Sequence, residues 1–224
     1  MMTQKILVIG AHPDDETLGV GGTVVKHIAN GATAELCVVT AGYEPLITRE
    51  EMDARRKEAL DASAILGFSN THFLELPAVK LDTLPKIQLN DSLKKVIDSF
   101  KPDTVYTTGD TDMNMDHRYV HEATMVAARP RPGCSVKRLL TYELPSSTEW
   151  GAMMLGTPFT PNVFVDISET LDKKIEAMKA YKMELKEFPH PRSLKNIEAM
   201  ATFRGASVGV KAAEAFRLIY DRSQ

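Results

Sequence analysis

The sequence of 224 residues predicts a single α/β domain that spans residues 1–224. Short apolar runs rich in Val and Ile alternate with longer segments of helical period from the first residues onward, which is typical of successive βαβ units. The apolar runs lack polar alternation, as expected for strands that helices cover on both faces. No linker, repeat or low-complexity segment divides the chain. We therefore expect a mostly parallel, Rossmann-like sheet with helices on both faces.

Two glycines mark the ends of the first two predicted helices. Gly31 and Gly67 stand where the end of a helix favours a left-handed residue. The second helix is expected to pack on the core through four apolar residues, Met52, Leu60, Ala64 and Ile65. The elements predicted in this half are strands at residues 5–10, 34–42, 71–76 and 103–109, and helices at residues 17–30, 49–66 and about 84–100.

A long irregular stretch, residues 145–161, interrupts the pattern in the second half of the chain. A loop of that length inside a compact domain is more often functional than idle. The elements predicted around it are a helix at residues 117–128, strands at 137–144 and 162–168, a helix at 169–186, a short helix after the corner FPHPRS at 188–193, and an edge strand in the tail AEAFRLIY at 213–220.

The composition excludes several classes of protein. The 27 Lys and Arg against 30 Asp and Glu give a net charge of −3, which provides no field for gathering nucleic acid. The two cysteines form neither a disulfide framework nor a four-cysteine metal cluster, and they suit a reducing compartment. The N-terminal apolar run is too short for a signal peptide, and no segment approaches a membrane span. We expect a cytoplasmic protein with no nucleic-acid partner and no integral membrane segment.

The first predicted strand ends in the segment AHPDDE, which places His12, Asp14, Asp15 and Glu16 at the carboxyl edge of the sheet. Three acids and an imidazole crowded there would lose solvation and repel one another unless a cation compensates them. His12 and Asp15 lie three residues apart across a turn and can reach one metal ion, while Asp14 can serve as a base. The alternative is that an acid merely caps the following helix, but capping requires one acid and no histidine.

A second polar cluster, TTGDTDMNMDHRYVH, follows the fourth predicted strand at residues 107–121. Catalytic zinc typically takes three protein ligands and leaves one position for water. His12, Asp15 and His117 meet that description, and Asp116 would be a second-shell or proton-handling group beside the metal-bound histidine. His121 is interpreted as a packed or surface histidine rather than a fourth ligand, although its place one turn beyond His117 would let it approach the site.

Together with TLGVGGT, VVTAG, RRKEALDASAILG, NMDHRYVHEA and AEAF, the AHPDDE segment resembles the PIG-L/LmbE-like zinc-dependent N-deacetylases over nearly the whole chain. The resemblance implies zinc ligation by His12, Asp15 and His117, with Asp14 as the general base and Asp116 as the aspartate of the family's H-x-D-H segment. This sequence departs from the family at Asn114, where a histidine is expected to stabilise the oxyanion or pass a proton. Asparagine can donate a hydrogen bond but cannot titrate.

Two histidines are candidates for the missing titratable role. His190 lies between prolines in the corner FPHPRS, where it could face a reaction centre in its own subunit or a neighbouring one, and His121 is the second candidate. A solvent-exposed histidine on a turn is the alternative for His190. Arg55 matches the family's Arg-x-x-Glu pattern and is a candidate substrate-binding residue together with Asn114. A surface ion pair between Arg55 and Glu58 is its structural alternative.

The predicted function is a hydrolase with one zinc per chain that removes the N-acetyl group of an N-acetylglucosamine-type amino sugar or its conjugate, giving acetate and a free amine. The sequence does not define the sugar's aglycone, and the family resemblance favours a homo-oligomer. One alternative is a nucleotide-sugar glycosyltransferase that binds metal through Asp110 and Asp112. Another is a non-catalytic binding module. Dinucleotide binding by Gly19, Gly21 and Gly22 is disfavoured because acids fill the preceding turn. We interpret these glycines as allowing the first helix to pack close to the sheet.

Overall fold

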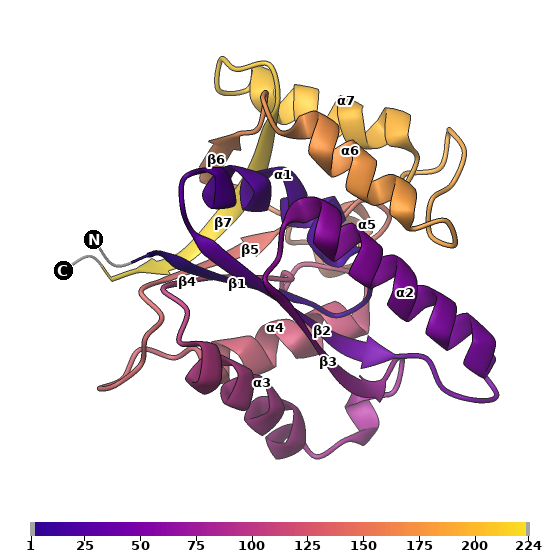
Figure 1. Ribbon diagram of the computed structural model, residues 1–224, viewed down its shortest axis with the longest axis vertical. Helices are drawn as coiled ribbons and strands as arrows, with labels where there is room; N and C mark the ends of the chain where they lie inside the picture. The colour runs from indigo at the N-terminus through magenta and orange to yellow at the C-terminus, as the bar shows by residue number, and fades with distance from the viewer. Residues whose placement is uncertain (1–2, 223–224) are drawn as a thin grey trace.

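The computed structural model describes residues 3–222, which form one seven-stranded sheet with helices on both faces (Figure 1). The strands are β1 (Lys5–Gly10), β2 (Thr33–Ala41), β3 (Asn70–Pro77), β4 (Thr104–Thr107), β5 (Arg138–Tyr142), β6 (Val163–Asp166) and β7 (Ala213–Asp221). The helices are α1 (Asp15–Ala29), α2 (Arg49–Leu66), α3 (Lys86–Phe100), α4 (Met115–Ala127), α5 (Thr148–Leu155), α6 (Leu171–Ala180) and α7 (Leu194–Ala206), with the short 3-10 helix η1 (Leu81–Thr83).

The sheet order is β3-β2-β1-β4-β5-β7-β6. The five strands from β3 to β5 in this order are parallel, and β7 runs antiparallel to both β5 and β6. The prediction of an α/β fold with a mostly parallel sheet is therefore confirmed. Because the order reverses direction between β1 and β4, the loops after these two strands meet at the carboxyl edge, where open α/β sheets bind ligands.

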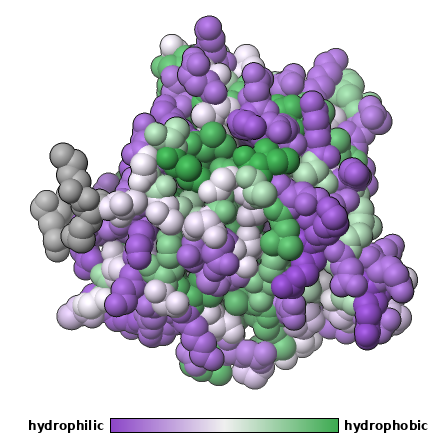
Figure 2. Space-filling view, in the orientation of Figure 1, coloured by the Kyte–Doolittle hydropathy of each residue, from purple (hydrophilic) through white to green (hydrophobic). Residues whose placement is uncertain are grey.

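Each face of the sheet carries its own hydrophobic core. Ile6 and Val8 of β1 pack with residues of α1, α2 and α6 on one face, whereas Leu7 and Ile9 pack with residues of α3 and α4 on the other. This alternation explains why β1 is apolar along its whole length, since both faces of the strand are covered. Figure 2 shows polar and apolar side chains interspersed over one outer face, as is usual for a globular domain. No helix within residues 3–222 has the length and apolar character needed to cross a membrane.

Close packing of α1 on the sheet depends on its glycines. A Cβ on Gly19 would lie 2.3 Å from the Tyr142 ring, and one on Gly22 would lie 3.0 Å from Ile167. The Tyr142 hydroxyl in turn donates to the Ile9 carbonyl at 2.8 Å, which ties β5 to β1 directly beneath the helix. The structure thus supports a packing role for these two glycines.

Several predicted elements differ in the structure. The tail strand β7 lies between β5 and β6 and is not an edge strand. The stretch predicted to be irregular contains α5, and α6 ends at Ala180, six residues earlier than expected. On α2, Leu60 is 46% exposed and Ala64 is also exposed. The prediction for these two residues was wrong because the helix packs through Ala59, Ala62, Ser63 and Leu66, a face shifted round the helix.

Candidate active site

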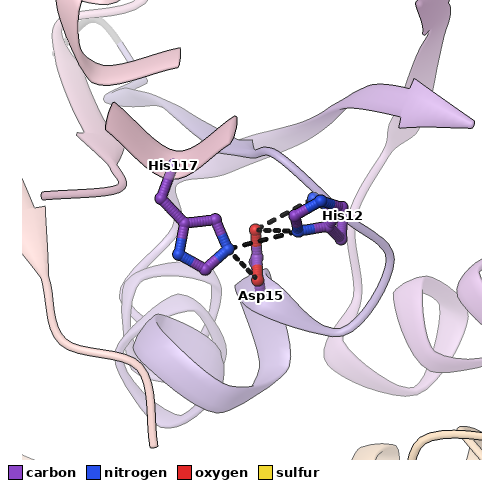
Figure 3. Close-up of side chains that lie close together, drawn as sticks. All are labelled: His12, Asp15 and His117. Atoms are coloured by element: carbon purple, nitrogen blue, oxygen red, sulfur yellow. Dashed lines mark hydrogen bonds and ion pairs between the residues drawn. The ribbon is translucent and has the colours of Figure 1, made fainter. Parts of the chain in front are cut away.

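Three predicted metal ligands converge at the carboxyl edge of the sheet: His12 from the β1–α1 loop, Asp15 from the first turn of α1, and His117 from α4 (Figure 3). One potential ligand atom of each lies within 4.8 Å of the others. His12 Nδ1 is 3.2 Å from His117 Nε2, and Asp15 places Oδ2 3.9 Å from His12 Nδ1 and Oδ1 3.5 Å from His117 Nε2. The two histidines are separated by 105 positions in the sequence, and the adjacent strands β1 and β4 bring them together.

The turn between β1 and α1 orients the first two ligands. The backbone N–H of His12 donates to Asp15 Oδ2 at 2.9 Å, which closes the turn against the start of α1. A Cβ on Gly10 would lie 3.0 Å from the Asp15 Cβ, so glycine leaves the room this turn needs. Asp14 has φ 103°, a left-handed conformation that costs a non-glycine residue on the order of 1–3 kcal/mol. The fold maintains this strain at the residue proposed to act as the base.

The ring nitrogens that face the ligand group, the inner nitrogens, are His12 Nδ1 and His117 Nε2. The other nitrogen of each ring, its outer nitrogen, faces a buried carboxylate. Asp116 Oδ2 lies 3.0 Å from His12 Nε2 and also accepts from the Val79 N–H at 2.7 Å. Asp112 Oδ1 lies 3.1 Å from His117 Nδ1. Asp116 therefore contacts His12, not the neighbouring His117 as the sequence led us to expect. Such carboxylates fix the orientation of a metal-binding imidazole and increase its basicity.

Charges around His117 define the electrostatics of the site. Burial alone would lower the pKa of His117, but the carboxylates of Asp15 and Asp112 raise it to about 10. Burial would likewise raise the pKa of Asp15, but His117 and His12 outweigh that effect and lower it to about 2. The pKa values of Asp15 and Asp112 are both lowered and that of His117 is raised, so the two buried carboxylates are anionic and require a positive charge at the position of His117 or beside it. Such a pair of buried carboxylates favours a compensating cation.

The donor set fits zinc. Two imidazole nitrogens and one carboxylate oxygen are ligands that zinc commonly takes, and three protein ligands with an open position are typical of catalytic sites. The inner nitrogens of both histidines face the carboxylate of Asp15, while their outer nitrogens are engaged by other acids. The residues present are therefore suitable for binding one ion through His12, Asp15 and His117.

The alternative interpretation of the AHPDDE segment was that one of its acids caps the following helix, but the side chain of Asp14 does not cap α1. Asp14 is 3% exposed, and its side chain makes no capping hydrogen bond to α1. Arg192 Nη1 instead donates to Asp14 Oδ2 at 3.3 Å. Burial and the neighbouring charge of Asp15 raise the pKa of Asp14 well above its usual value, although Arg192 opposes them. This environment differs from that of Asp15, so the two adjacent carboxylates have distinct chemical characters.

Glu16, the last acid of the motif, does not lie at the mouth of the sheet. Its carboxylate is fully buried and accepts from the Tyr181 hydroxyl and the Thr17 hydroxyl, both at 2.6 Å. Burial raises the pKa of Glu16. The expectation that all three acids of this segment crowd the edge of the sheet was wrong for Glu16, because the helical turn directs its side chain toward α6 and its C-terminal end.

A cavity of about 580 Å³ opens beside the candidate ligands. His12, Asp14 and Asn114 line it, and its apolar lining includes Leu46, Ile47, Met52 and Phe73. Its charged lining includes Arg55 of α2, together with Glu184 and Arg192 from the segment between α6 and α7. The volume is in the range of small-molecule sites, which combine apolar walls with a few placed polar groups.

The two residues predicted to bind substrate both line this cavity. Arg55 forms an ion pair with Glu184 from the segment after α6, whereas Glu58 accepts from the Met183 N–H at 3.4 Å. The structure therefore does not show the surface pair between Arg55 and Glu58. Asn114 caps α4 by accepting from the Asp116 N–H at 2.9 Å, so its carbonyl oxygen is already used.

The two candidate histidines lie outside the group of ligands. His121 is buried, and its Nδ1 lies 3.0 Å from the Thr108 carbonyl, which matches the packed histidine preferred from the sequence. His190 is exposed, and its Nδ1 accepts from the Arg192 N–H at 3.0 Å. Within one chain the corner FPHPRS directs Arg192, not His190, into the cavity. Arg192 was noted in the sequence only as a neighbour, because nothing in the local pattern shows which side chain turns inward.

Asp110 and Asp112, the metal pair of the glycosyltransferase alternative, point to different places. Asp110 forms an ion pair with Arg217 at 3.1 Å and lies on the surface. Asp112 is buried behind His117, where its Oδ2 accepts from the hydroxyls of Ser147 at 2.9 Å and Thr148 at 2.7 Å. The two carboxylates do not form a shared site, and this arrangement argues against that alternative.

Comparison with known proteins agrees with this geometry. The family model PIG-L, described as GlcNAc-PI de-N-acetylase, matches residues 7–128. The chain is 33% identical over 189 residues to the uncharacterized deacetylase YaiS of Escherichia coli K12, covering 79% of this chain and 90% of the relative. It is 26% identical over 230 residues to diacetylchitobiose deacetylase of Thermococcus kodakarensis, covering 96% of this chain and 83% of the relative.

A solved structure extends the likeness in fold. GalB of Pseudomonas putida KT2440, a 4-carboxy-2-hydroxymuconate hydratase, superposes with a TM-score of 0.78 at 20% identity, covering 99% of this chain and 98% of that protein. Since that protein is named as a hydratase, the shared fold by itself does not define the reaction. The family model and the E. coli relative do define the family: the chain belongs to the PIG-L family.

Proposed function

We propose that this protein is a zinc-dependent deacetylase that removes the N-acetyl group of an N-acetylglucosamine-type amino sugar or its conjugate. Deacetylation is hydrolysis of an amide C–N bond outside a peptide. Family membership supports this reaction class, and the curated relative that acts on diacetylchitobiose supports a sugar substrate. The observation that carries the proposal is the convergence of His12, Asp15 and His117 beside a cavity that also contains Asp14.

His12, Asp15 and His117 would hold the zinc ion. When bound, zinc would supply Lewis acidity, which polarises an amide oxygen and lowers the pKa of a water toward about 7. Asp112 and Asp116 hold the two histidine rings in the orientation that presents their inner nitrogens. The three ligands and their two supporting acids come from the β1–α1 loop, α1, the β4–α4 loop and α4, so the sheet fixes the whole group.

Asp14 would move the proton. As a carboxylate it accepts a proton from the attacking water, and it then gives that proton to the amine nitrogen as the C–N bond breaks. Asp14 is buried, lines the cavity and precedes Asp15 in the chain, and it is not one of the three candidate ligands, which supports this role. Asn114 lines the same cavity, and its side-chain amide N–H can donate a hydrogen bond to the developing oxyanion.

The direct test is acetate release from a panel of N-acetylglucosamine conjugates that differ in the aglycone: a lipid, a nucleotide, a thiol conjugate and a free oligosaccharide. We expect stoichiometric acetate and free amine from at least one member, and release of both products about a hundredfold or more slower with Asp14→Asn protein. Consumption of a nucleotide-sugar donor without acetate would instead favour the glycosyltransferase alternative. Binding of a panel member without turnover of any of them by zinc-loaded protein would favour the non-catalytic module.

A further inference from the structure

Arg192 joins three parts of the chain at the wall of the cavity. Its Nη1 donates to Asp14 Oδ2 at 3.3 Å and to Glu184 Oε2 at 2.6 Å, and its Nε donates to Ser146 Oγ at 3.0 Å. Arg192 lies between α6 and α7, Asp14 precedes α1, and Ser146 precedes α5. Glu184 and Ser146 thus hold the Arg192 guanidinium that donates to Asp14.

Glu184 anchors this arginine and is anchored itself. Its carboxylate pairs with Arg192 through Oε2 and with Arg55 of α2 through Oε1. The Glu184 side chain is 16% exposed and the Arg192 side chain 31% exposed, so water competes only in part for these contacts. A chain of alternating charges, Arg55–Glu184–Arg192–Asp14, therefore runs along the cavity wall and ends on the proposed base.

The contact with Arg192 distinguishes the two oxygens of Asp14. Oδ2 accepts from Arg192, whereas no donor within residues 3–222 forms a hydrogen bond with Oδ1. The side chain is 4% exposed and has no capping bond to α1, so Arg192 provides its one directional contact. A carboxylate held through one oxygen presents the other in a fixed direction, which is the geometry that a base in a preorganised site needs.

We propose that Arg192 is the positioning residue for Asp14, holding one carboxylate oxygen so that the other faces the reacting water. The inference rests on the proposed role of Asp14 as the base. It assigns to the corner FPHPRS a function carried by the arginine at its inner side and not by the exposed His190. The contact to Asp14 is a single hydrogen bond, so the planar fork of Arg192 serves here to link Asp14, Glu184 and Ser146 at once.

The test is steady-state kinetics of Arg192→Ala and Arg192→Lys, with zinc content and circular dichroism of each. Arg192→Ala is expected to keep its zinc and fold, to lower kcat about 10–100-fold, the scale of a displaced catalytic group, and to leave KM nearly unchanged. Added guanidinium, far below denaturing concentrations, should restore part of kcat. Arg192→Lys should lie between the parent and Arg192→Ala. Arg217→Ala, which removes a partly exposed arginine paired with Asp110, is the matched control and should behave like the parent.

A double-mutant cycle separates positioning from a structural role. If Arg192 acts through Asp14, Arg192→Ala should add almost no loss in the Asp14→Asn background. Fully additive losses, a rise in KM with kcat unchanged, or parent-like kinetics of Arg192→Ala would each overturn the inference. Failure of the proposed function would look different: Asp14→Asn would then retain turnover, whatever Arg192→Ala does. If Arg192→Ala does not fold, the cycle is run with Arg192→Lys.

Discussion

Asp112 Oδ1 lies 3.1 Å from His117 Nδ1, so a buried carboxylate stands directly behind the candidate ligand from α4. Ser147 and Thr148 hold the other oxygen of this carboxylate. Asp112 thereby connects the start of α5 to the candidate metal ligand His117. Its position explains why part of the stretch predicted to be irregular is ordered against the site.

This relationship predicts a specific effect on metal affinity. Asp112→Asn should weaken zinc binding by about 10–100-fold, because loss of the carboxylate reduces the basicity and orientation of His117. Asp110→Asn is the matched control two residues away, since Asp110 contacts Arg217 on the surface and should leave affinity unchanged. Competition with a zinc chelator measures both. Equal affinities for the two variants would show that Asp112 does not support the ligand.

We expect the purified protein to hold about one zinc per chain, since its three ligands form one site. His12→Ala should empty the site, and chelation of the parent should abolish deacetylation in a way that added zinc reverses. His121→Ala removes a buried histidine that bonds to Thr108 and not to the ligand group, so it should keep its metal. Elemental analysis of the three proteins checks this. Full zinc content in His12→Ala would exclude the assignment.

The exposed position of His190 leads to a prediction about the corner. Within a single chain, His190→Ala should retain the parent's turnover, because its ring contacts the backbone of Arg192 outside the cavity. The earlier expectation that His190 titrates in catalysis requires a neighbouring subunit. It would be supported if His190→Ala lowered turnover and mixing its chains with Asp14→Asn chains restored part of the activity.

The buried ion pair between Lys174 of α6 and Glu214 of β7 is predicted to make a large contribution to the free energy of unfolding. Lys174 Nζ lies 2.6 Å from Glu214 Oε1, and the same carboxylate accepts from the N–H groups of Gly22 and Thr23. Lys174→Met leaves this buried charge without its cation and should lower the free energy of unfolding by about 3–5 kcal/mol. Lys173→Met next to it removes only an exposed pair with Glu176 and should cost less than about 1 kcal/mol. Urea unfolding of both variants tests the difference.

Local patterns in the sequence were sufficient for most of the fold. β1 and α2 have the predicted bounds because an uninterrupted apolar run and a helix between Thr48 and Gly67 are local signals. The place of β7 was not predictable in this way, since its pairing with β5 and β6 joins strands far apart in the sequence. The buried face of α2 was misjudged because small residues, Ala59 and Ala62, pack against neighbours that the helical pattern alone does not reveal.

The grouping of the three candidate metal ligands could be predicted from the sequence, and the contacts around them could not. His12 and Asp15 have a short spacing, and all three residues follow predicted strands of a parallel sheet, so both signals are visible in the sequence. The partners of Asp14, His12 and His117 depend on distant segments meeting at the sheet edge. Asp14 and Arg192 are separated by 178 positions in the sequence, and no local signal indicates their contact. For the same reason, the sequence did not distinguish Asp112 from its neighbour Asp110 or assign Asp116 to His12.

Adjacent carboxylates provide the most direct test of the central claim, which is that Asp15 holds the metal while Asp14 moves the proton. Zinc content and acetate release are measured on Asp14→Asn and Asp15→Asn, two isosteric changes at neighbouring positions. The account predicts that Asp15→Asn loses its zinc, whereas Asp14→Asn keeps zinc and fold yet loses about a hundredfold or more in turnover. Loss of zinc from Asp14→Asn, or parent-like turnover with its zinc in place, would contradict it.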